Sequence, residues 1–147
     1  MKRNISSAVG GGAGFPPQSG ITRLRFSPGN FDENVRPAID FYGIYRLEKK
    51  DIVPSTGFGI FFEFLEIRDT IFPMFGSSFN LMYLYNREQK KWEITTEFLL
   101  SIYVESVINQ NFSIFYELPV NLLRSGYIFP KFSLIFGGIF YLERWGK

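Results

Sequence analysis

The sequence predicts an all-β protein, built as an antiparallel, up-and-down barrel of about eight strands. Three observations support this fold class: side chains alternate with a period of two, β-branched and aromatic residues are abundant, and turn-forming residues separate the alternating segments. In Lys91–Glu105, one alternate row runs from Trp92 to Val104 without a charge, while the other carries carboxylates. The 147 residues suit a single β-barrel domain, 1–147, with a core of ordinary size.

Eight segments fit the alternation. In chain order they are Ser6–Phe15, Ile21–Ser27, Ala38–Leu47, Gly57–Leu65, Ser78–Asn86, Trp92–Val104, Asn111–Leu118 and Lys131–Glu143. The first is the weakest, because its glycines bury little surface and are unfavourable in a strand, so residues 1–20 are expected to be a weakly defined first strand and lead-in. The pieces between the segments, such as EKKDIVPST and Arg68–Gly76, are expected to be turns and loops.

The two alternate rows differ in chemistry. One row is uncharged and rich in phenylalanine in nearly every segment, and the chain holds 18 Phe in total. A soluble eight-stranded barrel that enclosed all these rings would overfill its interior. We therefore expect the apolar row to face lipid and the mixed row to fill a narrow lumen. The charged residues predicted in that lumen are Arg23, Arg25, Asp40, Arg46, Glu63, Glu93, Glu97, Glu117 and Lys131.

These lumen charges are expected to form a structural network, because buried charges are tolerated only when they are paired. If eight strands close in sequence order, the second lies opposite the sixth. Arg23 and Arg25 would then face Glu93 and Glu97 across the lumen, with Glu117 on the neighbouring strand. Lys131 would reach Glu117 between the last two strands.

Two aromatic residues flank the predicted REQKK turn. Tyr85 and Trp92 share the apolar row, so the hairpin would place both rings at one rim of the barrel. Amphipathic aromatic side chains settle there at the boundary between lipid and water. An ordinary cross-strand aromatic pair is the alternative interpretation.

In strand number, row chemistry and length, the chain resembles the small outer-membrane barrels of the OmpX and OmpA-transmembrane type. Gly137, Phe140 and Leu142 are similar in spacing to the final strand that such barrels present to the assembly machinery, although this chain continues to Lys147. The resemblance implies the outer membrane of a diderm, Gram-negative-type bacterium. The lipid bilayer would be the main partner, and protein or lipopolysaccharide would be contacted through loops. The N-terminus lacks the apolar run of a signal peptide, so no export signal is expected in this chain.

Composition excludes several kinds of chemistry. The chain has no histidine and no cysteine, so Ser–His–Asp and Cys–His catalysis and thiolate or imidazole metal sites are ruled out. The net charge of +2 is too small to indicate a nucleic-acid partner. The glycine-rich stretch Gly10–Pro17 lacks the Lys and Ser/Thr of a phosphate-binding loop. We expect no enzymatic activity, catalytic residue, cofactor or metal.

The sequence thus predicts a small integral outer-membrane protein with a structural, adhesive or partner-binding role through its loops and no wide pore. Two alternatives stay open. One is a soluble lipocalin-like barrel, in which the apolar row faces a cavity for a hydrophobic ligand. The other is a portion or subunit of a larger membrane barrel, which would explain the poor first strand.

Overall fold

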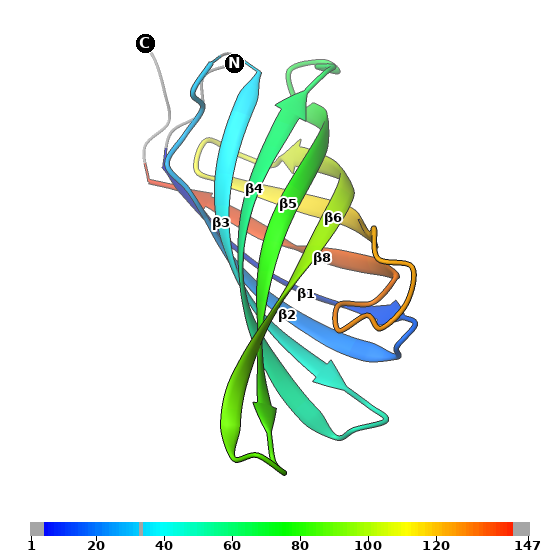
Figure 1. Cartoon of the computed structure of the whole chain (residues 1–147). Helices are drawn as coiled ribbons and strands as arrows, with labels where there is room; N and C mark the ends of the chain where they lie inside the picture. Colours follow the sequence, from blue (N-terminus) through cyan, green and yellow to red (C-terminus); the bar gives the residue numbers. More distant parts are fainter. Residues whose placement is uncertain (1–4, 33, 143–147) are drawn as a thin grey trace.

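The computed structural model describes residues 5–32 and 34–142 (Figure 1). Its eight strands are β1 (Ser6–Phe15), β2 (Ser19–Ser27), β3 (Val35–Arg46), β4 (Asp51–Glu63), β5 (Ile71–Asn86), β6 (Lys91–Val107), β7 (Phe112–Asn121) and β8 (Phe132–Tyr141). Each strand pairs antiparallel with the next, and β1 pairs with β8, so the sheet closes into a barrel. The predicted fold class is confirmed. Among the described residues, no helix is long and apolar enough to cross a membrane.

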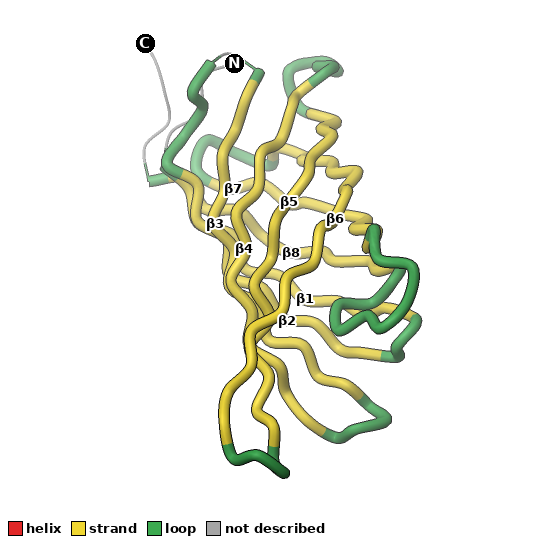
Figure 2. Tube along the Cα trace, viewed as in Figure 1, coloured by secondary structure: helices red, strands yellow, loops and turns green. Residues whose placement is uncertain are grey.

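The connections differ between the two ends of the barrel (Figure 2). At the end where β1 begins and β8 ends, they are residues 28–34, 64–70 and 108–111. At the opposite end lie three short turns and one longer loop, at residues 16–18, 47–50, 87–90 and 122–131. We call this second end the hairpin end. Its β3–β4 and β5–β6 hairpins diverge from one another below the barrel (Figure 1).

β4 and β5 begin inside segments that the sequence pattern assigned to connections. The pattern assigned these stretches to connections because they contain turn-forming residues, including Pro54 and Pro73, and proline has no backbone N–H to donate to a ladder. In the structure, Pro54 and Pro73 each lie just outside the β4–β5 hydrogen-bond ladder. The β4–β5 ladder starts at Ser55, the residue after Pro54, and ends at Met74, the residue after Pro73. Neither proline therefore interrupts that ladder, and both strands are longer than predicted.

The glycines of the wall make room for large rings inside the barrel. β1 has the predicted bounds and pairs along its length with both neighbours. A Cβ on Gly10 would lie 2.6 Å from the Phe115 ring. On β5, a Cβ on Gly76 would lie 2.3 Å from the Phe61 ring. These glycines are required by the packing of the lumen, which offsets their unfavourable propensity in a strand.

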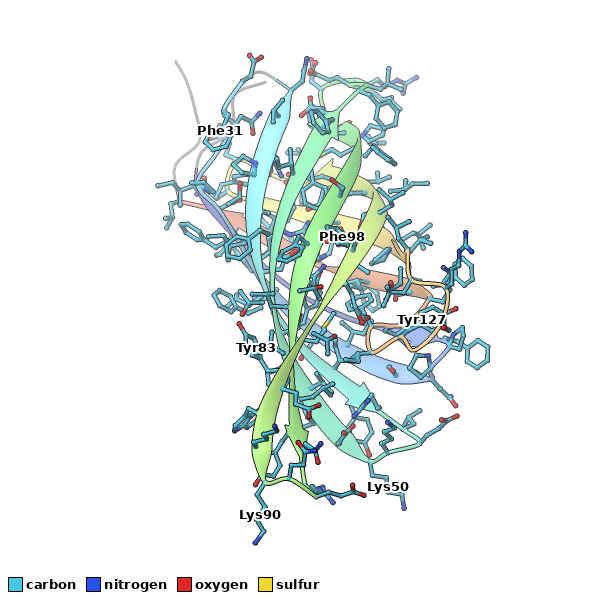
Figure 3. The ribbon with its side chains drawn as sticks, in the orientation of Figure 1. Phe31, Lys50, Tyr83, Lys90, Phe98 and Tyr127 are labelled. Atoms are coloured by element: carbon cyan, nitrogen blue, oxygen red, sulfur yellow. The ribbon has the colours of Figure 1, made fainter. Side chains whose placement is uncertain are left out.

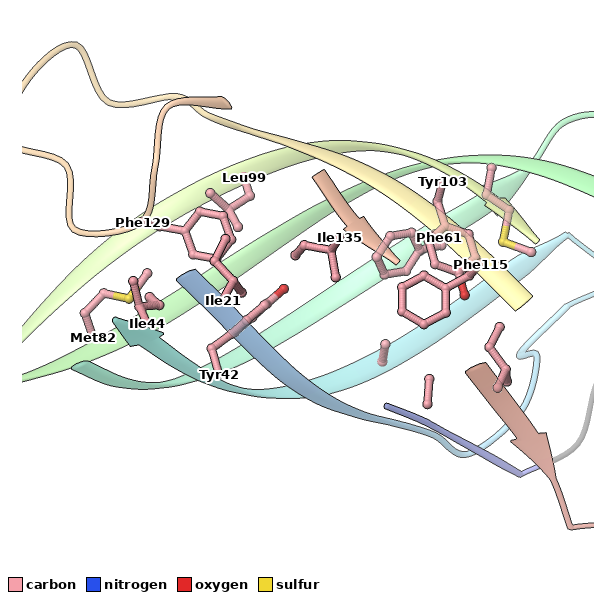
Figure 4. Packing of buried hydrophobic residues seen from close by; sticks show 14 of the residues in the cluster. Ile21, Tyr42, Ile44, Phe61, Met82, Leu99, Tyr103, Phe115, Phe129 and Ile135 are labelled. Atoms are coloured by element: carbon pink, nitrogen blue, oxygen red, sulfur yellow. The ribbon is translucent and has the colours of Figure 1, made fainter. Parts of the chain in front are cut away.

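The apolar row of the sequence lies on the outer wall. Phe62, Phe98 and Phe136 are 48%, 52% and 56% exposed, and Figure 3 shows Phe98 on the wall. The buried cluster inside the barrel instead contains Phe61 and Phe115, each at most 2% exposed (Figure 4). The exposure pattern is therefore inside out relative to a soluble barrel.

Candidate functional site

The centre of the lumen holds an ion network that joins β2, β3 and β7. Arg25 donates two parallel hydrogen bonds to Asp40, Nε to Oδ1 at 2.6 Å and Nη2 to Oδ2 at 2.9 Å. Its Nη2 also lies 3.3 Å from Oε1 of Glu117, whose other oxygen pairs with Arg23. Tyr42 donates to Asp40 at 3.3 Å. All five side chains are buried, so each charge depends on its partners.

Aromatic rings pack against the two arginines of this network. Arg25 lies over the Phe61 ring at 4.3 Å, and Arg23 lies over the Phe115 ring at 4.7 Å. Tyr103 stacks on Phe115 with a centroid distance of 5.5 Å (Figure 4). A desolvated guanidinium over a ring face is stabilised by the ring quadrupole. The lumen is therefore filled by alternating ions and rings.

A second ion group lies nearer the end where β1 begins and β8 ends. Arg36 on β3 donates to Glu105 on β6 at 3.1 Å and to the Tyr141 hydroxyl on β8 at 3.2 Å. Tyr141 also donates to Glu105. Sequence reasoning missed this group, because Arg36 precedes Pro37 in a predicted loop and Glu105 follows the predicted end of its strand. Continued alternation was the available signal, since Arg36 shares the row of Asp40.

At the hairpin end, Glu97 holds the loop of residues 122–131 over the barrel mouth. Its carboxylate accepts hydrogen bonds from the backbone N–H of Ile128 at 3.1 Å and of Phe129 at 2.9 Å, and from the Asn121 side chain at 2.8 Å. Phe129 is fully buried and meets the Tyr42 ring edge to face at 5.3 Å. The loop thus inserts a ring into the lumen and covers this end.

The predicted pairing of Arg23 and Arg25 with Glu93 and Glu97 is wrong, and so is that of Lys131 with Glu117, whereas Glu117 does lie beside the two arginines. Glu93 is exposed and accepts from the Asn86 side chain at 3.1 Å, because the β5–β6 hairpin extends beyond the barrel. Lys131 donates to the backbone carbonyls of Asn121 and Leu123 instead of reaching Glu117. The structure brings Arg23, Arg25, Asp40 and Glu117 together and gives Glu97 backbone partners.

The two remaining predicted residues lie near the ends of their strands. Arg46 pairs with Asp51 across the β3–β4 hairpin, with Nε 2.8 Å from Oδ1. Their side chains are 11% and 30% exposed, so this pair belongs to the rim and not to the enclosed network. Glu63 is half-buried at the end of β4.

The described residues leave little empty space between the two ion groups. Between Arg25 and Arg36 there is a cavity of about 10 Å³, lined also by Phe61, Met74 and Tyr103. This is about the room that one water molecule needs. In this part of the lumen the ionic groups are packed against one another and against aromatic rings.

At the end where β1 begins and β8 ends, the loop of residues 64–70 carries the acidic residues Glu66 and Asp69. The pKa of Glu66 in the exposed loop of residues 64–70 is raised, because its protonated carboxyl group donates a hydrogen bond to the Asp69 carboxylate and the charge of Asp69 repels a charge on Glu66. Within residues 5–32 and 34–142, no group of three or more carboxylate, histidine or cysteine side chains is placed to hold a metal ion.

On the outer wall, Tyr85 and Trp92 are directly paired across the β5–β6 hairpin. Their ring centroids are 5.3 Å apart, the planes are inclined by 59°, and the residues are 49% and 63% exposed. The pair lies next to the charged turn of residues 87–90. Tyr85 and Trp92 are therefore a cross-strand aromatic pair, and this pair lies at the rim of the hairpin end.

A closed barrel of eight antiparallel strands with an apolar outer wall is the architecture of the small outer-membrane β-barrel proteins. Among solved structures, the chain is similar to the N-terminal β-barrel domain of OprF from Pseudomonas aeruginosa, with a TM-score of 0.70 and 11% identity over 95% of this chain and 98% of that chain. It is also similar to Neisserial surface protein A, with a TM-score of 0.64 and 10% identity over 95% of each chain. No protein-family model and no curated protein matches the sequence. The predicted architectural resemblance is confirmed, and at these identities it concerns the fold.

Proposed function

We propose that the protein is a small integral protein of the outer membrane of a diderm bacterium, with a structural, adhesive or partner-binding role through its loops and no enzymatic activity. The observation that carries the proposal is the inside-out exposure of the barrel. Rings such as Phe98 are exposed on the wall, while Arg23 and Glu117 are at most 2% exposed. Water would reverse this arrangement, and hydrocarbon favours it.

The height of the apolar wall supports this placement. On β6 the outward row runs from Trp92 to Val104 without a charge. At about 3.3 Å per residue and a tilt of about 40°, this row spans roughly 30 Å. The apolar band of outer-membrane barrels is about 25 Å tall. The wall therefore matches the bilayer in height as well as in chemistry.

A soluble carrier of a hydrophobic ligand is a poor fit. That alternative needs the apolar row to face a cavity, whereas the row lies outside and the lumen space between Arg25 and Arg36 is about 10 Å³. A part of a larger barrel is also disfavoured, because β1 and β8 pair along their length and leave no edge in the barrel wall. The filled lumen supports a role without a wide pore.

We place the partner-binding role in the loops of residues 28–34 and 64–70. Phe31 in the first loop is 78% exposed (Figure 3). Phe64 in the second loop is 65% exposed. Aromatic side chains are enriched where proteins meet partners, and loops commonly carry such contacts. Catalysis is not part of the proposal, because the lumen carboxylates are buried and hydrogen-bonded.

A charge placed on the wall tests the membrane placement. We compare Phe98→Arg with Phe98→Ala at the middle of the band, and Leu47→Arg with Leu47→Ala at the β3–β4 turn. Arginine at the middle of a bilayer costs about 2–4 kcal/mol, and about 0–1 kcal/mol near the interface. The free energy of unfolding in vesicles is the measurement, with the gel mobility of heated and unheated samples reporting folding.

A soluble barrel would give another result. Phe98 and Leu47 are 52% and 43% exposed, so in water arginine would be tolerated similarly at both positions. Equal costs at the two positions, or a chain that stays monomeric and folded without detergent, would overturn the proposal.

A further inference from the structure

The β3–β4 and β5–β6 hairpins enclose a groove on the outside of the barrel at its hairpin end. The β4–β5 ladder starts only at Ser55 and Met82, so beyond these residues the two strands separate. Pro54, the next residue of β4, has no backbone N–H with which to continue the ladder. The separation leaves a groove of about 390 Å³. Figure 1 shows the two hairpins diverging at this point.

The groove has an apolar, aromatic wall and a cationic mouth. Its lining includes Ile52, Tyr83, Tyr85 and Trp92, and the cations Lys50 and Arg87 come from the two turns. Ile52 and Trp92 are 70% and 63% exposed, so none of the residues that the structure describes covers this wall. A volume of several hundred Å³ is in the range of small-molecule sites.

One carboxylate also lines the groove, and it is already neutralised. Asp51 accepts two hydrogen bonds from Arg46 across the β3–β4 hairpin. Arg87, on the other hairpin, lines the same groove as Lys50 and Asp51, so the two turns face one common space. With Asp51 paired to Arg46, Lys50 and Arg87 give the mouth a net positive charge.

We propose that this hairpin groove binds one phosphate-bearing anionic lipid of the surrounding membrane. Lys50 supplies a point charge and Arg87 a planar pair of donors to the phosphate, while Tyr83, Tyr85 and Trp92 contact the glycerol and the first acyl carbons. The inference rests on the membrane placement proposed above, because that placement brings the groove to the height of the lipid headgroups. Each cation near the surface favours an anionic lipid, and two of them give roughly a tenfold preference over a zwitterionic lipid after screening by salt.

Quenching of Trp92 by brominated lipid measures this preference. The chain has two tryptophans, so Trp145→Phe leaves Trp92 as the single reporter. The protein is inserted into phosphatidylcholine vesicles that contain brominated phosphatidylglycerol, or brominated phosphatidylcholine, at the same low mole fraction. The expected result is stronger quenching by phosphatidylglycerol, equivalent to about a tenfold local enrichment.

Two double variants locate the site. Lys50→Gln with Arg87→Gln should abolish the enrichment. Lys49→Gln with Lys90→Gln removes the same charge from the same two turns, but outside the groove lining, and should preserve the enrichment.

Equal quenching by the two lipids in a correctly inserted barrel would overturn the lipid site and leave the membrane placement standing. Equal loss in both double variants would also overturn the site, since it would reduce the effect to general surface charge. A chain that does not insert into vesicles would overturn both proposals, and its unchanged gel mobility on heating would identify that case.

Discussion

Replacing Arg25 by methionine should destabilise the barrel strongly, because Arg25 lies between two buried carboxylates. Asp40 is fully buried and, among the described residues, would keep the Tyr42 hydroxyl at 3.3 Å as its direct partner, and Glu117 would keep Arg23. Removing one partner of a buried ion pair costs about 3–5 kcal/mol, since the remaining charge has no compensation. The aliphatic part of methionine still fills the space beside Phe61, so most of this cost is electrostatic.

A double-mutant cycle separates that electrostatic cost from lost packing. Arg25→Met with Asp40→Leu removes both charges, and replacing a buried pair with apolar residues is often neutral or stabilising. The double variant should therefore recover most of the stability that Arg25→Met loses, with a coupling energy of about 3 kcal/mol. Urea unfolding in vesicles, followed by tryptophan fluorescence and by gel mobility, gives the free energies.

Arg46→Met is the matched control, because it breaks a bidentate pair that lies at the rim. Asp51 is 30% exposed there, so we expect a loss of at most about 1 kcal/mol. A loss below about 1 kcal/mol for Arg25→Met, or equal losses for Arg25→Met and Arg46→Met, would refute the reasoning. If Arg25→Met does not fold at all, folding of the double variant still tests the argument.

Two further predictions concern the packing and the covered end of the lumen. Gly76→Ala places a methyl group 2.3 Å from the Phe61 ring and should lower the free energy of unfolding by about 1–3 kcal/mol. The double variant Gly76→Ala with Phe61→Leu should recover part of this loss, and the absence of any recovery would contradict the contact. Glu97→Leu removes the acceptor of the backbone N–H groups of the loop of residues 122–131, so trypsin should cleave more rapidly after the exposed Arg124. Glu93→Leu, on the same strand but exposed, should leave the cleavage rate unchanged, and similar rates in both variants would argue against the role of Glu97.

The faces of the strands could be predicted from sequence because strand geometry alone decides them. Successive side chains point to opposite faces, so the uncharged row from Trp92 to Val104 had to lie together on one face. The count of phenylalanines then decided which face was enclosed, since an eight-stranded lumen holds few large rings. Neither step needs information on how distant strands meet.

The partners of the lumen charges could not be predicted, because they depend on register and stagger. Arg25 and Asp40 are direct cross-strand partners between β2 and β3. That register is set through the loop of residues 28–34, which is not a tight turn of defined type. Across the lumen, the shear of the barrel brings Arg23 to Glu117 on β7 and not to a residue of β6. The order of the strands alone does not reveal this shift in height between strands across the lumen.

The ion group of Arg36, Glu105 and Tyr141 was missed for a different reason, because the strand limits were set too short at a proline. Arg36 was lost because Pro37 was taken as the end of a strand, yet Pro37 pairs with Ile60 on β4 and lies beyond the last β2–β3 pair, at Ile39. In a barrel with staggered ladders, each strand extends past one neighbour before it leaves the other, and proline fits at such one-sided positions. Alternation should therefore be followed through a proline for as long as the charged row stays in phase, as it does from Asp40 back to Arg36.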